Sequence, residues 1–289
     1  MPVTPRPHFA IPLPGRAPLE LGRRTLVMGV LNLTPDSFSH DGLVGDPARA
    51  IDLVQEMEAA GADLIDVGAE STRPGAEPVD AAEESARLRP VLRALGGRAR
   101  VPLSVDTTKA AVANFALDEG VALVNDVSGL EYDPAMGPLI AARGVPVVLM
   151  HMRGRPRDMY AGADYADVVH EVMRQLQRRI ERAVGLGIRW DRLLVDPGIG
   201  FAKHAEDSFR VLAGAGRLTA LGRPVLVGPS RKSFMTAATG ALPVGERDWP
   251  TAAAATAAVL AGAHIVRVHR VAEMVQVVRV ADAIRDAAP

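Results

Sequence analysis

Short apolar runs recur along the chain, and each is followed by polar residues and glycine and then by a stretch with helical periodicity. The runs are rich in valine, isoleucine and leucine and do not alternate with polar positions, which is typical of strands buried on both faces of a parallel sheet. Eight such runs occur, at residues 26–31, 62–67, 101–105, 121–124, 145–150, 192–195, 223–227 and 263–268. The pattern therefore predicts eight parallel strands.

Amphipathic segments with helical spacing separate these runs. One begins with Asp46 as its N-cap and Pro47 at the first helical position, and Gly61 ends it. The longest such segment covers about residues 163–184. Residues 251–266 are mostly alanine and too short to cross a bilayer, so we expect a buried helix that runs into a strand.

Strands that alternate with helices at this length predict an α/β protein with a closed (β/α)8 (TIM) barrel, and a doubly wound open sheet is the alternative. The chain has 289 residues, close to the size of one such barrel. We place a single barrel domain at residues 23–287 and an N-terminal extension at residues 1–22. This extension contains six prolines and no apolar segment of the kind that a signal peptide needs.

Composition narrows the possible functions. The net charge of −1 gives no general attraction to nucleic acid or to an anionic membrane, so we expect neither as a partner. The chain has no cysteine, which excludes disulfides, thiolate metal sites and cysteine catalysis. A reducing compartment is compatible with this, and we expect a cytoplasmic protein.

Polar residues stand at the C-terminal end of every predicted strand. In order along the chain they are Asn32, Asp66, Asp106, Asn125 with Asp126, His151, Asp196, Ser230 with Arg231 and Lys232, and Arg267 with His269. In a (β/α)8 barrel these ends meet at one mouth, where active sites lie. Packing does not explain the whole set, because a buried polar group without a partner costs free energy.

Several of these residues have a plainer interpretation when each is taken alone. Asp106 could cap the helix that follows it, and Asp66 could lie in a turn. His151 could be a core histidine that hydrogen bonds to the backbone.

An anion site is predicted at the last two strands. Residues 228–233 follow the seventh strand and lead toward a helix, so that backbone N–H groups and the helix dipole would face a ligand. Arg267 and His269 are two residues apart on the eighth strand and point the same way, and Arg73 can reach in from the second loop. Such a site suits a phosphate or a carboxylate; the alternative is an exposed basic cluster.

A polar floor is predicted at the middle strands. Asp106, Asn125 and Asp196 would suit a heterocycle with several N–H donors, because a mismatched ligand leaves such groups unpaired. The alternative is a carboxylate metal cage, although the missing histidine cluster argues against zinc. Asn32 could bind Mg2+ through its carbonyl oxygen if a diphosphate and water supply the other ligands.

An ordered series of motifs resembles the dihydropteroate synthase family. The motifs are MGVLNLTPDSFS at 28–39, DVGAESTRPGA at 66–76, SVDTTK at 104–109, NDVSG at 125–129, LMHM at 149–152, DPGIGF at 196–201, SRKS at 230–233 and RVH at 267–269. They span nearly the whole chain in the family's order. Two positions depart from the family pattern, Arg270 in place of aspartate and the ending of the first loop at His40–Gly42.

The resemblance implies a role for each motif residue. It implies that Asp106, Asn125, Asp196 and Lys232 hold a pterin ring, and that Asn32, Arg73, Arg267 and His269 hold its diphosphate, with Asn32 also on Mg2+. It further implies that Thr72, Pro74, Phe201 and Ser233 form the 4-aminobenzoate pocket, which sulfonamides occupy in this family. Asp106, Lys232 and Arg73 are the expected catalytic residues.

The reaction implied is the condensation of a pterin diphosphate with 4-aminobenzoate in folate biosynthesis, carried out by a homodimer. Diphosphate would leave with the help of Mg2+ and the cationic side chains, and the floor carboxylates would stabilise the resulting carbocation. Closure of the first two loops would exclude water. The alternatives are a pterin-dependent methyltransferase domain and a non-catalytic pterin-binding paralogue, which would lack the second loop or the SRKS motif.

Overall fold

The computed structural model describes residues 3–34, 46–73 and 75–288. Its main sheet consists of the parallel strands β3 (Leu26–Asn32), β4 (Leu64–Gly68), β5 (Leu103–Asp106), β6 (Leu123–Asp126), β7 (Val147–Met150), β8 (Leu193–Asp196), β9 (Leu226–Val227) and β10 (Ile265–Val268). The strand order is β8-β7-β6-β5-β4-β3-β10-β9. A parallel bridge between Val195 and Val225 joins the two outer strands, so the sheet closes on itself. The predicted (β/α)8 barrel is confirmed, and the open sheet is wrong.

The seventh strand of the barrel, β9, is shorter than the predicted run of residues 223–227. Pro224 and Pro229 flank it, and proline has no N–H to donate to a strand ladder. Pairing still occurs on both sides, because the Val195 N–H donates to Pro224 O at 3.0 Å and the His264 N–H donates to Val225 O at 2.8 Å.

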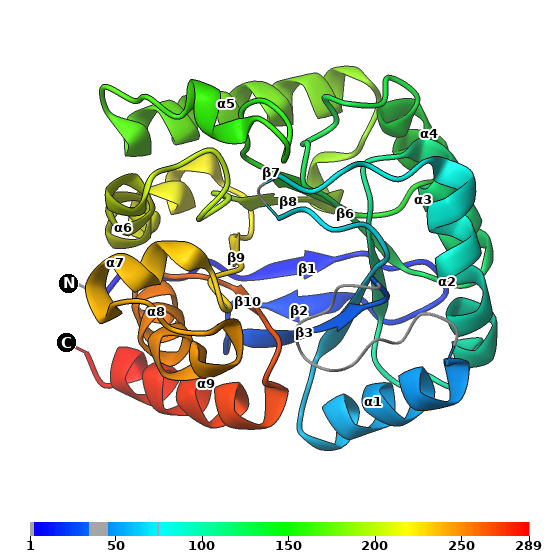
Figure 1. Ribbon diagram of the computed structural model, residues 1–289, viewed down its shortest axis with the longest axis horizontal. Coiled ribbons are helices and arrows are strands. Elements are labelled where there is room, and N and C mark those ends of the chain that lie inside the picture. Colours follow the sequence, from blue (N-terminus) through cyan, green and yellow to red (C-terminus); the bar gives the residue numbers. More distant parts are fainter. Residues whose placement is uncertain (1–2, 35–45, 74, 289) are drawn as a thin grey trace.

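Helices surround the strands (Figure 1). They are α1 (Pro47–Ala59), α2 (Ala81–Leu95), α3 (Ala110–Asp118), α4 (Met136–Arg143), α5 (Val168–Gly185), α6 (Ala205–Ala213), α7 (Thr236–Thr239), α8 (Asp248–Leu260) and α9 (Val271–Asp286). Short 3-10 helices are η1 (Met159–Gly162), η2 (Trp190–Arg192), η3 (Ala215–Leu221), η4 (Ser233–Met235) and η5 (Val244–Glu246). Within the described residues, none of these helices has the length and apolar character needed to cross a membrane.

Two helix starts show how local chemistry sets the boundaries. Asp46 accepts the N–H of Arg49 at 3.0 Å, so α1 begins at Pro47 as predicted. The longest helix, α5, begins at Val168 rather than near residue 163 as predicted, because Asp167 accepts the N–H of His170 at 3.0 Å and caps the helix there.

The barrel interior is filled in layers, because residues two apart on a strand face the same side. The lower layer consists of Leu64, Leu123, Leu194 and Ile265, which belong to one buried apolar cluster. Two residues further along the same four strands lies the upper layer, which consists of Asp66, Asn125, Asp196 and Arg267. The intervening residues, such as Ile65, Val124, Val195 and Val266, pack outward in the cluster that includes helix residues.

A hairpin closes the lower end of the barrel, within the segment predicted as an N-terminal extension. Its strands, β1 (Phe9–Ile11) and β2 (Leu19–Leu21), pair antiparallel. Ile11 and Leu21 are each 1% exposed and pack in the same cluster as the lower layer. The hairpin therefore belongs to the core of the barrel, and the strand ends at the opposite side are left to form the site.

Candidate active site

The upper layer is joined by an ion-pair network. Arg267 donates from Nε to Asp66 Oδ2 at 2.6 Å and from Nη2 to Asp106 Oδ2 at 2.9 Å. Asn125 Nδ2 donates to the same Asp66 oxygen at 2.9 Å. Arg267 thus links the predicted anion site to the predicted floor. Sequence reasoning treated Asp66 as a possible turn residue, but its side chain is fully buried within this network.

Some polar atoms in this layer and on the neighbouring strand β5 are unpaired. Within the described part of the chain, Asp66 Oδ1 and Ser104 Oγ are buried and have no hydrogen-bond partner. A buried unpaired acceptor is costly, and a ligand N–H aimed at it would remove that cost.

The floor carboxyls have shifted acidities. Burial raises the pKa of Asp106 to about 7, although the neighbouring Arg267 opposes the shift. Burial likewise raises the pKa of Asp196 to about 6, against the Gly198 N–H that donates to its Oδ1 at 2.7 Å. Asp106 does not cap the next helix, because α3 starts at Ala110 after Lys109. Both carboxyls can therefore change protonation near neutral pH.

Lys232 and Phe201 form one wall of the site. The Lys232 ammonium lies 3.5 Å from the centre of the Phe201 ring, a cation–π contact. Burial, followed by the charge of Arg267, lowers the pKa of Lys232 to about 7. A Cβ placed on Gly200 would lie 3.3 Å from Lys232 Cδ, so glycine at this position lets the loop pass close to the lysine.

The turn after β9 directs its two basic residues to opposite sides. Arg231 has a positive φ of 59°, and its guanidinium pairs with Asp248 at 2.9 and 3.0 Å, outside the floor. Lys232 is thereby directed inward. The helix predicted to follow is only η4 and the four-residue α7, so the predicted helix-dipole contribution to anion binding is not supported.

His269 is held by the same turn. Ser230 Oγ accepts the His269 N–H at 3.2 Å and lies 2.8 Å from its Nδ1. Burial and the charge of Arg267 lower the pKa of His269 to about 3, so the ring is neutral. Nδ1 is thus engaged by Ser230, and Nε2 is the ring nitrogen left for a ligand.

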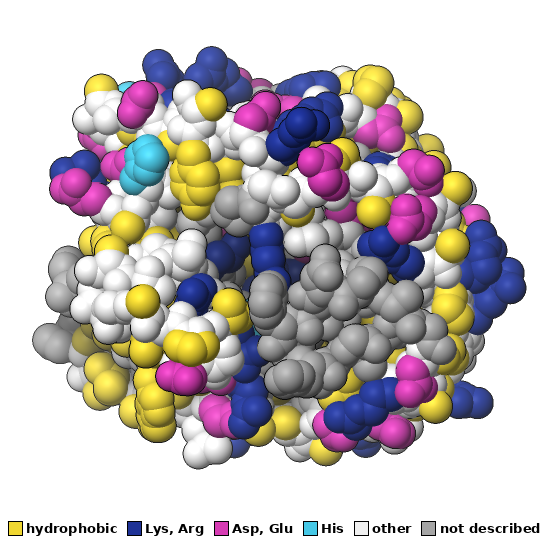
Figure 2. Space-filling model, viewed as in Figure 1, with side chains coloured by type: hydrophobic (Ala, Val, Ile, Leu, Met, Phe, Trp, Pro, Cys, Tyr) yellow, Lys and Arg dark blue, Asp and Glu magenta, His cyan; other side chains and the backbone are white. Residues whose placement is uncertain are grey.

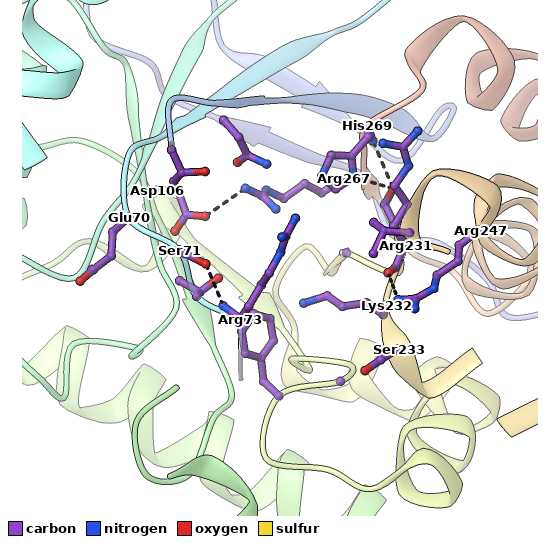
Figure 3. A pocket seen from close by; sticks show the side chains of 18 of the residues that line it. Glu70, Ser71, Arg73, Asp106, Arg231, Lys232, Ser233, Arg247, Arg267 and His269 are labelled. Atoms are coloured by element: carbon purple, nitrogen blue, oxygen red, sulfur yellow. Dashed lines mark hydrogen bonds and ion pairs between the residues drawn. The ribbon is translucent and has the colours of Figure 1, made fainter. Parts of the chain in front are cut away.

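One cavity of about 390 Å³ opens at this mouth. It is lined by nearly all predicted loop and anion-site residues: Asn32, Thr72, Arg73, Asp106, Phe201, Lys232, Ser233, Arg267 and His269. Arg73, Lys232 and Arg267 point into the same hollow (Figure 3). Asn125 and Asp196 lie in the buried upper layer and are not part of the described cavity surface. Pro74, together with the first-loop residues 35–36 and 40–42, lies outside the described residues.

The lining is predominantly cationic. It carries five basic side chains, including Arg247, and two acidic ones, Glu70 and Asp106. Dark blue Lys and Arg side chains gather in the hollow at the centre of this face (Figure 2). Sequence reasoning missed Arg247, which follows no strand and reaches the cavity from the segment between η5 and α8; it donates to Arg231 O at 3.2 Å.

The prediction that every strand end directs a polar group toward the mouth is wrong for β7, and of the pair that ends β6 only Asn125 faces inward. Asp126 accepts from the N–H groups of Ser128 and Leu130 at 2.8 and 2.9 Å and folds the next turn. His151 is fully buried and lies 3.2 Å from Gln175 on α5. Both residues have outward parity, since Val124 and Leu149 two positions earlier pack in the outer cluster.

The described residues contain no group of three or more His, Cys, Asp or Glu side chains that could hold a metal ion. The carboxylate-cage alternative is therefore not supported. Asn32 lies beside the floor, because a Cβ on Gly68 would lie 3.4 Å from Asp106 Cβ and 3.9 Å from Asn32 Oδ1.

Comparison with known proteins agrees with this geometry. The family model described as "pterin binding enzyme" matches residues 28–269. The chain belongs to this family. A dihydropteroate synthase of Synechocystis is 42% identical to this pterin-binding enzyme over 278 residues, which cover 96% of each chain.

Solved structures of the family also match closely. The dihydropteroate synthase of Yersinia pestis, solved in complex with a sulfonamide drug, has a TM-score of 0.90 and 41% identity and covers 97% of this chain and 100% of its own. That of Xanthomonas albilineans, solved with 4-aminobenzoic acid, has a TM-score of 0.87 and 41% identity, with 99% and 100% covered.

Proposed function

We propose that this pterin-binding enzyme is a dihydropteroate synthase. It is a transferase that condenses (7,8-dihydropterin-6-yl)methyl diphosphate with 4-aminobenzoate to give 7,8-dihydropteroate and diphosphate in folate biosynthesis. The observation that carries the proposal is a single cavity in which the Asp106 carboxyl, backed by the buried carboxylates and amide of the upper layer, meets a cationic wall. The full-length similarity to dihydropteroate synthases supports the same reaction.

The floor suits the pterin ring. Asp106, Asn125 and Asp196 offer acceptors and an amide to ring N–H groups, and the unpaired Asp66 Oδ1 adds one more acceptor. A ring that lacks these donors would leave buried acceptors unpaired, so the floor also provides selectivity. Lys232 closes the ring's edge from the Phe201 side.

The cationic wall suits the diphosphate. Arg73, Arg267 and the Nε2–H of His269 would bind its oxygens and stabilise the charge that grows as it leaves. Asn32 would supply one oxygen to Mg2+, and with no acidic cluster among the described residues the diphosphate and water would supply the rest. Bound Mg2+ would add charge neutralisation of the leaving group.

The protein's own residues stabilise the reacting atoms and need no covalent intermediate. The methylene carbon becomes electron-poor as the C–O bond to diphosphate breaks, and ionised Asp106 stabilises that charge from the floor. The amine of 4-aminobenzoate then forms the new C–N bond and releases a proton. Thr72, Phe201 and Ser233 line the cavity and form its proposed aminobenzoate pocket. The resemblance also assigns Pro74 to this pocket, and Pro74 lies outside the described residues.

Sulfonamides would compete for this aminobenzoate pocket, a proposal supported by the drug complex of the Yersinia pestis relative. The protein partners with small molecules in this proposal; the absence of nucleic-acid partners and the cytoplasmic location stay predictions.

A homodimer through α8 and α9 is also proposed. Three large apolar side chains on these helices, Trp249, Val280 and Ile284, are 85%, 62% and 52% exposed. Exposed apolar groups of this kind are typical of a surface that a partner covers. The apolar residues of α9 first considered for this role, Val271, Met274, Val275 and Val278, are at most 6% exposed and pack in the core instead.

The test is a diphosphate-release assay with Mg2+. Diphosphate should appear only when both the pterin diphosphate and 4-aminobenzoate are present, with dihydropteroate formed in equal amount. Release without aminobenzoate, or no turnover, would overturn the proposal and favour the non-catalytic paralogue. A methyltransferase domain is disfavoured because the Thr72–Arg73 loop and the Ser230–Ser233 turn both line the cavity.

A further inference from the structure

A third lysine lies behind the active-site wall. The chain has 33 lysine and arginine residues together, and only Lys109, Lys203 and Lys232 are lysine. Lys203 is 1% exposed and follows β8 by seven residues, so it lies outside the cavity lining. In a chain that uses arginine almost everywhere, a buried lysine indicates a position that a guanidinium does not fit.

The Lys203 nitrogen sits among acceptors. Its Nζ lies 2.9 Å from Phe201 O, 3.0 Å from Gly198 O and 2.9 Å from His151 Nδ1. A longer contact of 3.4 Å reaches His151 O. The lysine therefore holds both ends of the segment from Gly198 to Phe201.

The hydrogen-bond direction around Lys203 is fixed by an arginine two residues beyond His151. Arg153 can only donate, and it faces the Gln175 carboxamide at 2.8 Å and 3.2 Å, so the Gln175 oxygen must point to it. The Gln175 nitrogen then donates to His151 Nε2 at 3.2 Å. The ring proton must consequently be on His151 Nδ1, which points at Lys203 Nζ.

That arrangement requires Lys203 to be an uncharged amine. A neutral amine has one lone pair, which accepts from His151 Nδ1–H, and two N–H bonds, which donate to Gly198 O and Phe201 O. Every valence is used once.

The electrostatic surroundings agree with this assignment. Burial lowers the pKa of Lys203 well below its ordinary value, and burial followed by the Lys203 charge does the same for His151. Of the charged groups nearby, the Asp196 carboxyl favours an ammonium at Lys203, whereas Arg179, Arg153 and Lys232 oppose it.

The segment that Lys203 holds shapes the cavity. A Cβ on Gly198 would lie 2.0 Å from His151 O, so the segment is pressed against the end of β7. Ala202 has a positive φ of 48°, and its carbonyl accepts from Tyr165 at 2.8 Å. This strained backbone carries the Phe201 ring to its position over Lys232.

We propose that Lys203 is a positioning residue whose neutral amine, at the end of the Arg153–Gln175–His151 hydrogen-bond chain, fixes Phe201 against Lys232. It touches no substrate and acts through the Phe201 wall. The proposal rests on the proposed function, because it assigns Phe201 to the aminobenzoate pocket.

The protonation state can be measured without any activity. Because the chain has three lysines, protein grown with [6-13C, 6-15N]lysine gives three side-chain signals. We expect the signal that is lost in Lys203→Met to have the 13C and 15N shifts of a neutral amine at pH 7, and to keep them at pH 6. Ammonium shifts for that signal would overturn the assignment.

A second variant keeps this test decisive if Lys203→Met does not fold. Gln175→Glu presents a carboxylate to His151 Nε2, which draws the ring proton to Nε2 and leaves Nδ1 as an acceptor. Lys203 should then become an ammonium and its signal should shift accordingly. Gln177→Glu, on the same helix with its amide bonded to Glu181, is the matched control and should leave the signal unchanged. An unchanged Lys203 signal in Gln175→Glu would overturn the chain.

Kinetics separates positioning from mere structure. In folded Lys203→Met the KM for 4-aminobenzoate should rise about tenfold or more, with the KM for the pterin diphosphate changed by less than about threefold. Lys203→Arg should not restore the KM, since a guanidinium cannot accept from His151. An unaltered aminobenzoate KM in either variant would overturn the positioning role. An inactive wild type with a neutral Lys203 signal would instead overturn the proposed function alone.

Discussion

The lower and upper layers of the barrel interior lie two residues apart on the same four strands, yet they differ in almost every property. The lower layer is aliphatic, sealed by the hairpin and fully buried. The upper layer contains two carboxylates, an amide and a guanidinium that were removed from water on folding. Buried charges contribute little net stability even when they are paired, whereas buried aliphatic side chains contribute directly. On each of these strands, the residue that stabilises the fold and the residue that serves the site are therefore only two positions apart.

The largest effect is expected at the rim of the upper layer. Asp106→Asn removes the charge that faces the reacting carbon and should lower kcat by about a thousandfold or more. The midpoint of thermal unfolding should stay within a few degrees of wild type, because Arg267 keeps its bond to Asp66. Steady-state kinetics and calorimetry check both values. Near-normal kcat would remove Asp106 from the mechanism.

A matched pair on β8 sharpens the comparison. Leu194→Ala should lower the free energy of unfolding by about 2–5 kcal/mol through the cavity it leaves, with KM values near wild type in the folded fraction. Asp196→Asn should do the reverse and raise the KM for the pterin diphosphate by about tenfold or more, with little loss of stability. Urea unfolding and kinetics on both variants measure this. If both changes affected the same quantity, the two layers would not be separable.

The floor carboxyls should give stability a pH dependence opposite in sign to that of the buried histidines His264 and His269. Asp106 and Asp196 have folded pKa values of about 7 and about 6, above their unfolded value of 3.8. The folded state then binds more protons than the unfolded state between about pH 4 and 7, so their contribution is present at low pH and is lost as pH rises through that window. Asp196→Asn should remove its share of that loss, so the stability of the variant relative to wild type should rise with pH in urea unfolding from pH 5 to 8, and Leu194→Ala should leave the slope unchanged. An equal slope in all three proteins would contradict the assignment.

A smaller effect is expected on binding heat. Lys232 and Asp106 both have pKa values of about 7, so a pterin ligand that ionises Asp106 and charges Lys232 releases protons below pH 7 and takes them up above it, and the two changes cancel near pH 7. Calorimetric binding enthalpies should therefore depend on the buffer's ionisation heat at pH 6 and, with the opposite sign, at pH 8. Enthalpies that are independent of the buffer at both pH values would show that ligand binding leaves both groups unchanged.

The barrel was predictable because its strands are buried on both faces and read as continuous apolar runs. Most cavity residues were predictable too, since strand ends meet at one mouth. The argument from strand ends did not consider which face of the strand each end residue lies on. Asn125 faces inward and Asp126 outward, and the same step separates Met150 from His151. Because both faces of these strands are apolar, the sequence alone does not say which of the two sets of alternate residues faces inward.

Other features depended on contacts that no local pattern contains. From the sequence, Asp66 looks like a turn residue. Its role becomes clear only from its ion pair with Arg267, which lies 201 positions further along the chain. Arg247 reaches the cavity from a loop, and Lys203 meets His151 only when β7 and β8 pair. Such residues follow from the closed barrel, so they become visible only after the fold is known.

The hairpin that closes the lower end of the barrel also sets the order in which ligands can bind and leave. Ligands enter and depart through the same opening, so whatever rests deepest must arrive before anything placed above it and leave after it. In the proposed arrangement the pterin ring rests on the buried floor, beneath the aminobenzoate pocket that Phe201 and Ser233 line. The order of substrate binding, the formation of dead-end complexes and inhibition by the last product to leave would then all follow from the hairpin that closes the far end of the barrel.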